Sequence, residues 1–425
     1  MNKSSDYKVV TMVSILLLLV TFTAIGQVKL QSSYSRFGLG DINHGYNVYQ
    51  SSLGGASYGV VDPYRISSIN PASYAKIDTG SFVFNAAFDG AFMESRTTNE
   101  STTSNYFNMN YFNVAFPITG WWRTSIGLLP YSTVGYDLNS YTQVDSIGDV
   151  RLGYIGDGGI TEVYWGNAFN IFKGLSVGVN TSFLFGGVNL AQESELLDIS
   201  LAFKYRVKST TDLRAFHFNF GIQYDTKFGK NEDYFLGLGF VYSPEQSLLG
   251  KGSSIGITYT GGGDGFEYVK DTIFIVDNGS GSIVIPLKIG GGFSIGKTDK
   301  WMFAFDATFD EYSRFKILNG EKEFSNSLRY NVGGQYYVGS YALNFGANYS
   351  NSYLTINETD INEIGISFGV GFPLKSTKFM ISYIDLAVEA GRRGTTSNNL
   401  IEQDFIKVKL GINIRNTWFR RPKYL

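Results

Sequence analysis

One stretch of the chain fits the pattern of a phosphate-binding loop. The residues "GGFSIGKT" (Gly291–Thr298) match G-x-x-x-x-G-K-[ST], in which backbone N–H groups and the start of a helix hold the phosphates. Such a loop requires a helix directly after it. The sequence instead continues as "DKWMFAFDATFDEY", with aromatic residues at alternate positions. We therefore expect the end of a strand and a short turn rather than a nucleotide site.

Residues for metal or nucleophilic chemistry are scarce. The chain has no cysteine and two histidines, His44 and His217, so a His/Cys zinc site cannot be built. A Ser-His-Asp arrangement around His217 is conceivable, with Asn219 on the same strand face, but nothing singles out a serine. The glycine-rich stretches "GDGGI" (Gly156–Ile160) and "GGGDG" (Gly261–Gly265) have turn composition without the acidic spacing of a calcium loop. We expect no enzyme activity, no metal and no cofactor.

The N-terminus has the layout of a secretory signal peptide. Lys3 and Lys8 precede an apolar run, Val9 to Ile25, and small residues precede Gln27. Cleavage after Gly26 is predicted, which makes residues 1–26 the signal peptide. The alternative is a permanent anchor helix, but the run is short for a spanning helix. Without cysteine there is neither a lipid anchor nor a disulfide.

From residue 80 onward the dominant signal has a period of two residues. In "SFVFNAAFDGAFM" (Ser81–Met93) one parity carries most of the aromatic side chains. Such alternation predicts strands with one apolar and one polar face. The same pattern recurs in Ile199–Lys208, Ala215–Asp225, Tyr234–Tyr242, Trp301–Tyr312, Tyr341–Tyr349, Glu363–Phe372, Phe379–Glu389 and Phe405–Ile414.

Two architectures place such strands differently. In a soluble sandwich the apolar face forms the core, whereas in an outer-membrane barrel it meets lipid. The segments have the length of ten or so residues that a tilted strand needs to cross the hydrocarbon layer. Aromatic residues gather at strand ends, as in interfacial girdles; these are Tyr106, Trp121, Trp122, Tyr164, Trp165, Tyr234, Tyr242, Trp301 and Tyr312.

The connections also favour the barrel. "FKGLS" (Phe172–Ser176) and "VGSYA" (Val338–Ala342) resemble tight periplasmic turns, and Met93–Tyr106 and Thr260–Ser282 resemble long outer loops. We predict an all-β, transmembrane outer-membrane barrel of about 14 antiparallel strands over residues 80–415. Residues 416–425 form a basic periplasmic tail. The net charge of −2 and 17% charged residues give no field that would recruit nucleic acid.

Charged and polar residues on the non-apolar parity are expected to line the lumen. Acidic and basic groups fall on different strands, which suggests an interior cross-linked by ion pairs. The alternative is that any barrel of this size fills its lumen with compensating charges, without a specific function. The candidates are Lys204, Arg206, His217, Asp306, Asp310, Tyr383, Asp385, Glu389, Lys407 and Lys409.

Residues 27–79 lack either period and are rich in glycine and proline. Irregular backbone is not tolerated against lipid but is tolerated inside a barrel, so this segment is expected to fold into the lumen as a hatch. The stretch "SLGGASYGVVDPYRISSINPASYA" (Ser52–Ala75) resembles the N-terminal hatch of the FadL-type long-chain fatty acid transporters. The hatch residues are Gly54, Gly55, Ala56, Asp62, Pro63, Asn70, Pro71 and Ala72.

This resemblance implies a hatch-gated outer-membrane channel for hydrophobic, fatty-acid-like compounds, with substrate leaving through a side opening in the wall. The style of "SYSRFGLGD" (Ser33–Asp41) and of the signal peptide resembles outer-membrane proteins of Bacteroidota. Some relatives there are barrel subunits of larger machines, such as the type IX secretion apparatus. The alternative function is therefore a non-transporting subunit of a secretion or envelope assembly complex. The expected partners are outer-membrane lipid, a hydrophobic ligand, and other outer-membrane or periplasmic proteins.

Overall fold

The computed structural model describes residues 32–199, 202–261, 266–317, 324–374 and 380–417; the predicted signal peptide and most of the basic tail lie outside these ranges. Within them, no helix is long and apolar enough to cross a membrane. The helical elements are short, and they are η1 Ser33–Arg36, α2 Val48–Ser52, η2 Pro71–Lys76, η3 Tyr312–Arg314 and η4 Ser397–Asn399.

Fourteen antiparallel strands form the wall of a closed barrel. They are β2 Ser81–Arg96, β3 Ser101–Pro117, β4 Trp122–Val144, β5 Gly148–Phe172, β6 Leu175–Leu196, β7 Lys204–Phe228, β8 Tyr234–Ser243, β11 Lys288–Lys297, β12 Trp301–Asp310, β14 Ser327–Val338, β15 Tyr341–Ile356, β16 Thr359–Pro373, β17 Met380–Gly394 and β18 Glu402–Thr417. The barrel closes where β18 pairs with β2 along their whole length. The predicted outer-membrane barrel is confirmed.

The two faces of the wall differ as the alternation predicts. On β15 and β16, Phe345 and Phe368 point outward and are about half exposed, whereas Asn344 and Ser367 point inward and are buried. The apolar outer face contacts the lipid. Closure of the barrel pairs the first wall strand with the last, so neither is left with an unpaired edge in the membrane. The chain is thus a protein of the bacterial outer membrane.

An aromatic girdle surrounds the end of the barrel where the turns are short. Exposed side chains at that end include Trp121, Tyr234, Trp301, Tyr336 and Tyr341, which suit a membrane interface. Three residues expected in a girdle face inward instead: two lie on the other strand parity, and Tyr312 lies in η3 beyond the end of β12. These are Tyr106, Tyr164 and Tyr312.

Short connections lie where the sequence predicts them. Strand β5 ends at Phe172 and β6 begins at Leu175, and β14 and β15 are joined by an equally tight turn. The phosphate-loop-like stretch is the end of β11 and a three-residue turn before β12, as expected. The prediction of two long outer loops is wrong. In place of the first loop, β2 continues to Arg96 and β3 begins at Ser101. Likewise, β9 (Gln246–Gly261) and β10 (Glu267–Ile285) occupy most of the other predicted loop.

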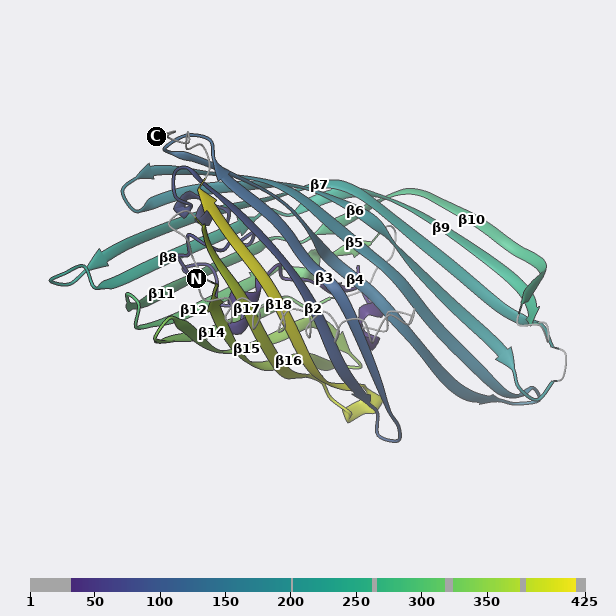
Figure 1. Cartoon of the computed structure of the whole chain (residues 1–425). Helices are drawn as coiled ribbons and strands as arrows, with labels where there is room; N and C mark the ends of the chain where they lie inside the picture. Colours follow the sequence, from purple (N-terminus) through teal and green to yellow (C-terminus); the bar gives the residue numbers. More distant parts are fainter. Residues whose placement is uncertain (1–31, 200–201, 262–265, 318–323, 375–379, 418–425) are drawn as a thin grey trace, which may run out of the picture.

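The strands β4 to β7 run far past the rest of the wall. They have between 22 and 25 residues, whereas β8, β11 and β12 have 10 each. A tilted strand needs about 9–11 residues to cross the membrane. The surplus forms, with β9 and β10, a sheet that projects beyond the barrel (Figure 1). Residues 204–208 of the predicted strand Ile199–Lys208 and the whole of the predicted strand Ala215–Asp225 belong to one element, β7. Residues 200–201 of the first predicted strand lie outside the described residues.

A row of glycines lies where this sheet leaves the barrel wall. Gly159 in β5 and Gly186 in β6 have φ values of +147° and +146°, a region that L-residues rarely adopt. A Cβ on Gly186 would lie 2.2 Å from the carbonyl oxygen of Gly159. The stretch Gly156–Ile160, expected to be a turn, lies instead inside β5. Glycine there permits the backbone conformation and the close strand approach that bend the sheet.

We predict that Gly186→Ala destabilises the barrel, because the substitution adds a backbone clash to an unfavourable φ. Strain of this kind costs about 1–3 kcal/mol. The measurement is the folded fraction during heating or urea titration, followed by the electrophoretic shift of the folded barrel. Gly120→Ala is the matched control, since its Cβ would meet nothing within 4 Å. Equal midpoints for the two variants would contradict the role assigned to the bend.

Candidate functional site

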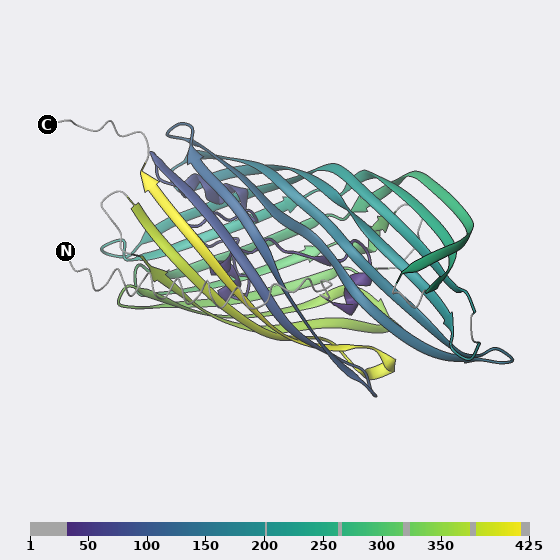
Figure 2. The same ribbon diagram turned by 45° about the vertical axis from the view of Figure 1, so that its right-hand side comes forward.

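The N-terminal segment, residues 32–80, lies inside the barrel (Figures 1 and 2). It contacts inward-facing residues of many strands, and most of its side chains are buried. At Gly54, φ is +66° and a Cβ would lie 2.5 Å from the carbonyl oxygen of Ala347. The N–H of Gly54 donates to Ser367 Oγ at 2.9 Å. Glycine therefore lets the segment pack directly against the backbone of the wall.

The Asn-Pro-Ala stretch forms a capped turn against β6 and β7. Asn70 is fully buried; its Oδ1 accepts from the N–H of Ala72 at 3.1 Å and its Nδ2 donates to the carbonyl of Tyr58 at 3.0 Å. Pro71 opens the helical turn η2, where its missing N–H costs nothing. Tyr74, at the same turn, donates to Asn180 Oδ1 at 3.0 Å. These residues thus fix both the shape and the position of the turn.

A buried ion cluster joins the segment to β17. The Arg65 guanidinium makes two bonds to Asp385, of 2.6 Å and 2.7 Å, and a third of 2.7 Å to Asp62. Its planar face lies over the rings of Tyr49 and Tyr383. Burial alone would lower the pKa of Arg65, but the two carboxylates hold that pKa well above its usual range. The arrangement is bidentate, which is the strong form of such a pair.

A second buried carboxylate, on β12, receives backbone donors of the segment. Oδ2 of Asp306 accepts from the N–H groups of Ser57 and Tyr58, at 2.6 Å and 3.0 Å. The Tyr58 hydroxyl lies 2.8 Å from Thr308 Oγ1. On β11, the Ser294 hydroxyl donates to the carbonyl of Gly59 at 2.7 Å. Irregular backbone inside the lumen therefore finds its partners in the wall.

Inward-facing amide side chains supply most of the remaining partners. Asn85 accepts from the N–H of Ile66 at 2.6 Å, and Asn219 donates to the carbonyl of Ile69 at 2.8 Å. The sequence-based list of lumen candidates contains none of these amides, because it was drawn mainly from charged residues. The available signal was amide residues recurring on the inward parity; they include Asn85, Asn180, Asn219, Gln223, Asn331, Asn344 and Asn413.

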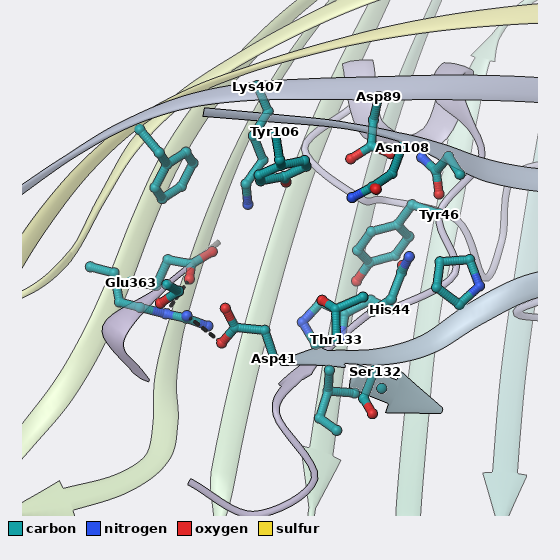
Figure 3. Close-up of a pocket in the computed structure, with 18 of the residues that line it drawn as sticks. Asp41, His44, Tyr46, Asp89, Tyr106, Asn108, Ser132, Thr133, Glu363 and Lys407 are labelled. Carbon is teal, nitrogen blue, oxygen red and sulfur yellow. Dashed lines mark hydrogen bonds and ion pairs between the residues drawn. The ribbon is translucent and has the colours of Figure 1, made fainter. Parts of the chain in front are cut away.

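A polar cavity of about 820 Å³ remains in the lumen beside the segment (Figure 3). The Arg393 guanidinium bridges Asp41 and Glu363, at 2.7 Å and 2.9 Å. Lys407 also lines the cavity, 4.1 Å from the ring centroid of Phe405. Burial and the nearby Arg329 cation hold the pKa of His44 well below its usual range. The lining carries charges of both signs beside apolar side chains.

Several of the candidate lumen residues contact the N-terminal segment or one another. Asp385 and Asp306 bind the segment as described, Tyr383 contacts Arg65, and Asp310 lies 3.9 Å from Arg329. Lys409 donates to Ser51 Oγ at 2.9 Å and lies 4.0 Å from Glu389. Together with Lys407, these residues form the charged part of the lumen.

His217 lies at the inner face of β7 without a complete triad. Its Nε2 is 2.9 Å from Ser243 Oγ. Among the described residues, Nδ1 of the ring has no hydrogen-bond partner, so no carboxylate orients the imidazole as a triad requires.

Lys204 and Arg206 are not in the lumen. Strand β7 pairs with β6 without a register shift from Leu175↔Tyr224 to Ser194↔Tyr205. Even-numbered residues therefore share one face throughout, and that face carries the exposed Phe216 and Phe218. Arg206 pairs there with Glu193 and Glu267, in the projecting sheet. The lumen assignment was wrong because the polar parity changes sides once the strand leaves the membrane.

The wall is interrupted between β3 and β4. These strands pair only through Phe112–Pro117 and Arg123–Leu128. Both strands are irregular where they part: the β2–β3 register shifts at Asn110, and the β4–β5 register shifts at Tyr131. Bulges of this kind bend a strand and end its pairing. We call the resulting gap, between Ser101–Asn110 and the outer part of β4, the seam.

The N-terminal segment covers part of the seam from inside. Strand β1, Asp41–Ile42, pairs antiparallel with Ser132–Thr133 of β4. The N–H of Asn43 donates to the carbonyl of Tyr131 at 2.9 Å, and the N–H of Ser32 to that of Gly135 at 3.2 Å. In Figure 3, Asp89, Tyr106 and Asn108 lie across the cavity from Ser132 and Thr133, so the cavity reaches the seam.

Comparisons with known proteins give one family and one fold. The family model described as BamG matches residues 8–425. No curated protein matches the chain. Among solved structures, a Pseudomonas aeruginosa FadL homologue has 12% identity and a TM-score of 0.58, covering 89% of this chain and 100% of its own.

Two toluene transporters share that fold. TbuX of Ralstonia pickettii has 14% identity and a TM-score of 0.58, covering 88% of this chain and 99% of its own. TodX of Pseudomonas putida has 15% identity and a TM-score of 0.56, covering 90% and 100%. The resemblance to FadL-type transporters thus extends to the fold of about nine-tenths of the chain, while the matching family model is a different one.

We predict that removing either partner of the buried pair loosens the N-terminal segment. Arg65→Met leaves two buried carboxylates without their cation, and Asp385→Leu leaves Arg65 with Asp62 as its remaining carboxylate partner in this cluster. Breaking a buried ion pair in this way costs about 3–5 kcal/mol. The double variant should be less destabilised than the sum of the single ones. Limited proteolysis of the segment and urea unfolding of the purified barrel measure both effects.

The control for this cycle is Arg392→Met, because Arg392 is half exposed and its ion pairs lie at the surface. Exposed pairs contribute at most about 1 kcal/mol. If the effects of Arg65→Met and Asp385→Leu on stability were additive, or if Arg392→Met destabilised the barrel equally, the cluster would not be what holds the N-terminal segment to β17.

Proposed function

The chain belongs to the BamG family, and on that premise we propose that it is a non-transporting barrel subunit of a larger outer-membrane complex. The observation that carries the proposal is the attachment of the N-terminal segment to the wall. Buried hydrogen bonds and ion pairs join this segment to strands on several sides of the barrel, among them β2, β7, β12, β16 and β17. Such a segment is built as a permanent seal.

Opening this seal would be costly. Moving the segment away would leave Arg65 apart from Asp385, and Asp306 without its backbone donors. Breaking a buried ion pair such as Arg65–Asp385 costs several kcal/mol. A hatch that moves during transport would need a way to compensate these groups in the open state. We therefore treat residues 27–79 as a hatch whose role is to close the lumen.

The projecting sheet offers a surface for a partner. On β10, Val269, Ile273 and Ile275 are 61%, 55% and 72% exposed. Strand β10 pairs with β9 on one side, and on the other its described residues pair only with β13 (Lys316–Ile317), through Ile283 and Val284. Exposed apolar side chains of this kind, beyond the membrane, mark a protein interaction site more readily than a lipid contact.

A second candidate function is a hatch-gated route for hydrophobic, fatty-acid-like compounds. The interruption between β3 and β4 favours it, because a lateral exit lets an apolar compound enter the membrane directly. The fold shared with two proteins described as toluene transporters agrees with this candidate. The charged lining of the cavity, which includes Glu363, Arg393 and Lys407, speaks against it, since an apolar ligand would leave these groups without solvent.

Purification in mild detergent separates the two functions. We expect the tagged full-length chain to bring down other outer-membrane or periplasmic proteins in fixed stoichiometry, without a bound fatty-acid-like compound. Mass spectrometry of the proteins and of the extracted lipids provides the measurement. A single barrel carrying such a compound would contradict the subunit function and support the channel.

Deleting Gly54–Tyr74 tests the seal itself. If these residues block the lumen, the deletion should raise the uptake of small polar solutes severalfold, measured by liposome swelling or by antibiotic sensitivity. Ser397→Ala, in an exposed connection, is the control. Unchanged uptake in a deletion variant that is still folded would show that other residues close the barrel.

A further inference from the structure

The seam between β3 and β4 leaves two strand edges unpaired. Across the described ranges of the chain, Ser101–Asn110 has a strand partner only in β2, and β4 beyond Gly135 has one only in β5. The opposite edge of each stretch therefore presents backbone N–H and C=O groups to the gap. Groups of this kind bind another strand readily, which is why proteins usually cover them.

The chain itself demonstrates that the β4 edge accepts a strand. Strand β1 adds to it over two residues, and backbone bonds from Ser32 and Asn43 extend that contact. The edge of β3 facing the gap receives no corresponding strand from the described part of the chain. The N-terminal segment thus adds a strand to the β4 edge of the seam, whereas no described residue adds a strand to the β3 edge.

The two sides of the seam have different chemistry. Toward the outside, Phe107 and Met109 are 54% and 45% exposed and lie in the membrane-facing wall. Toward the inside, Asp89, Tyr106 and Asn108 face the polar cavity. An extended chain with side chains alternating between apolar and polar would satisfy both sides at once, because successive residues of a strand point to opposite faces. A lipid acyl chain could not, since it offers no hydrogen bonds to the strand edges.

We propose that the seam is a docking site for an extended segment of a partner protein, which adds to the β3 edge as a strand. This inference rests on the proposed function as a complex subunit and names where one partner binds. The segment has alternating apolar and polar residues, with its apolar side beside Phe107 and its polar side toward the cavity. Strand addition of this kind obtains affinity from main-chain hydrogen bonds and specificity from alternate side chains.

Photo-crosslinking in the outer membrane of the native cell tests the site. A benzophenone amino acid replaces Phe107, beside the seam, or, as the control, Phe345 on β15, which is similarly exposed but belongs to a strand paired on both sides over this stretch. We expect protein adducts at Phe107 at least tenfold more abundant than at Phe345. Adducts with lipid alone, or only between two copies of this chain, would overturn the proposal.

Hydrogen exchange distinguishes an added strand from a mere neighbour. Amides of Ser101–Asn110 should exchange at least tenfold more slowly in the purified complex than in the isolated full-length barrel, while those of Asn344–Asn351 should not change. Phe107→Lys, which places a charge at the edge, should abolish this protection; Phe345→Lys should not.

The two proposals fail separately. If the complex purifies but Ser101–Asn110 gains no protection, the seam is not the docking site and the subunit function stands. If the chain purifies without partner proteins, the proposed function as a complex subunit is contradicted, and the docking proposal that rests on it falls as well.

Discussion

The structure depends on one constraint, which is that every backbone polar group inside a membrane barrel needs a partner. An irregular segment of some fifty residues can lie in this lumen only because the wall supplies those partners. Asp306 accepts two N–H groups, Asn85 accepts another, and Asn219 donates to a carbonyl. The Arg65–Asp385 pair then fixes the segment electrostatically. The wall and its contents are therefore one packed unit rather than a pore with a loose stopper.

The same constraint explains the seam. Where β3 and β4 part, the edge of β4 is partly covered by β1, and the exposed edges border a polar cavity rather than a continuous apolar face. Glycines at the same level, such as Gly159 and Gly186, have φ values that permit β5 and β6 to bend where they leave the wall. The separation of the strands, the bend and the projecting sheet thus form a connected set of features at one level of the barrel.

The comparisons and the geometry address different questions. The solved structures share the fold, at identities too low to transfer a ligand. The family model places the chain in the BamG family over almost its whole length. What distinguishes this barrel is its content: an N-terminal segment attached by buried polar contacts, a cavity lined with both charges, and a sheet that leaves the membrane with exposed apolar side chains.

The sequence by itself determined the barrel and its outward apolar face. The alternation of apolar and polar side chains depends on each strand and on whether its two faces meet lipid or the lumen, so it can be read from a single sequence. The sequence did not determine where strands continue beyond the membrane. Lys204 and Arg206 carry the polar parity expected of a lumen, yet lie on the outer face, because outside the lipid either face can be polar. Likewise, Gly156–Ile160 has turn composition but lies within a bent strand. Only the tertiary structure decided these points, and the pairing of Arg65 with Asp385, because they depend on which strands meet across the barrel.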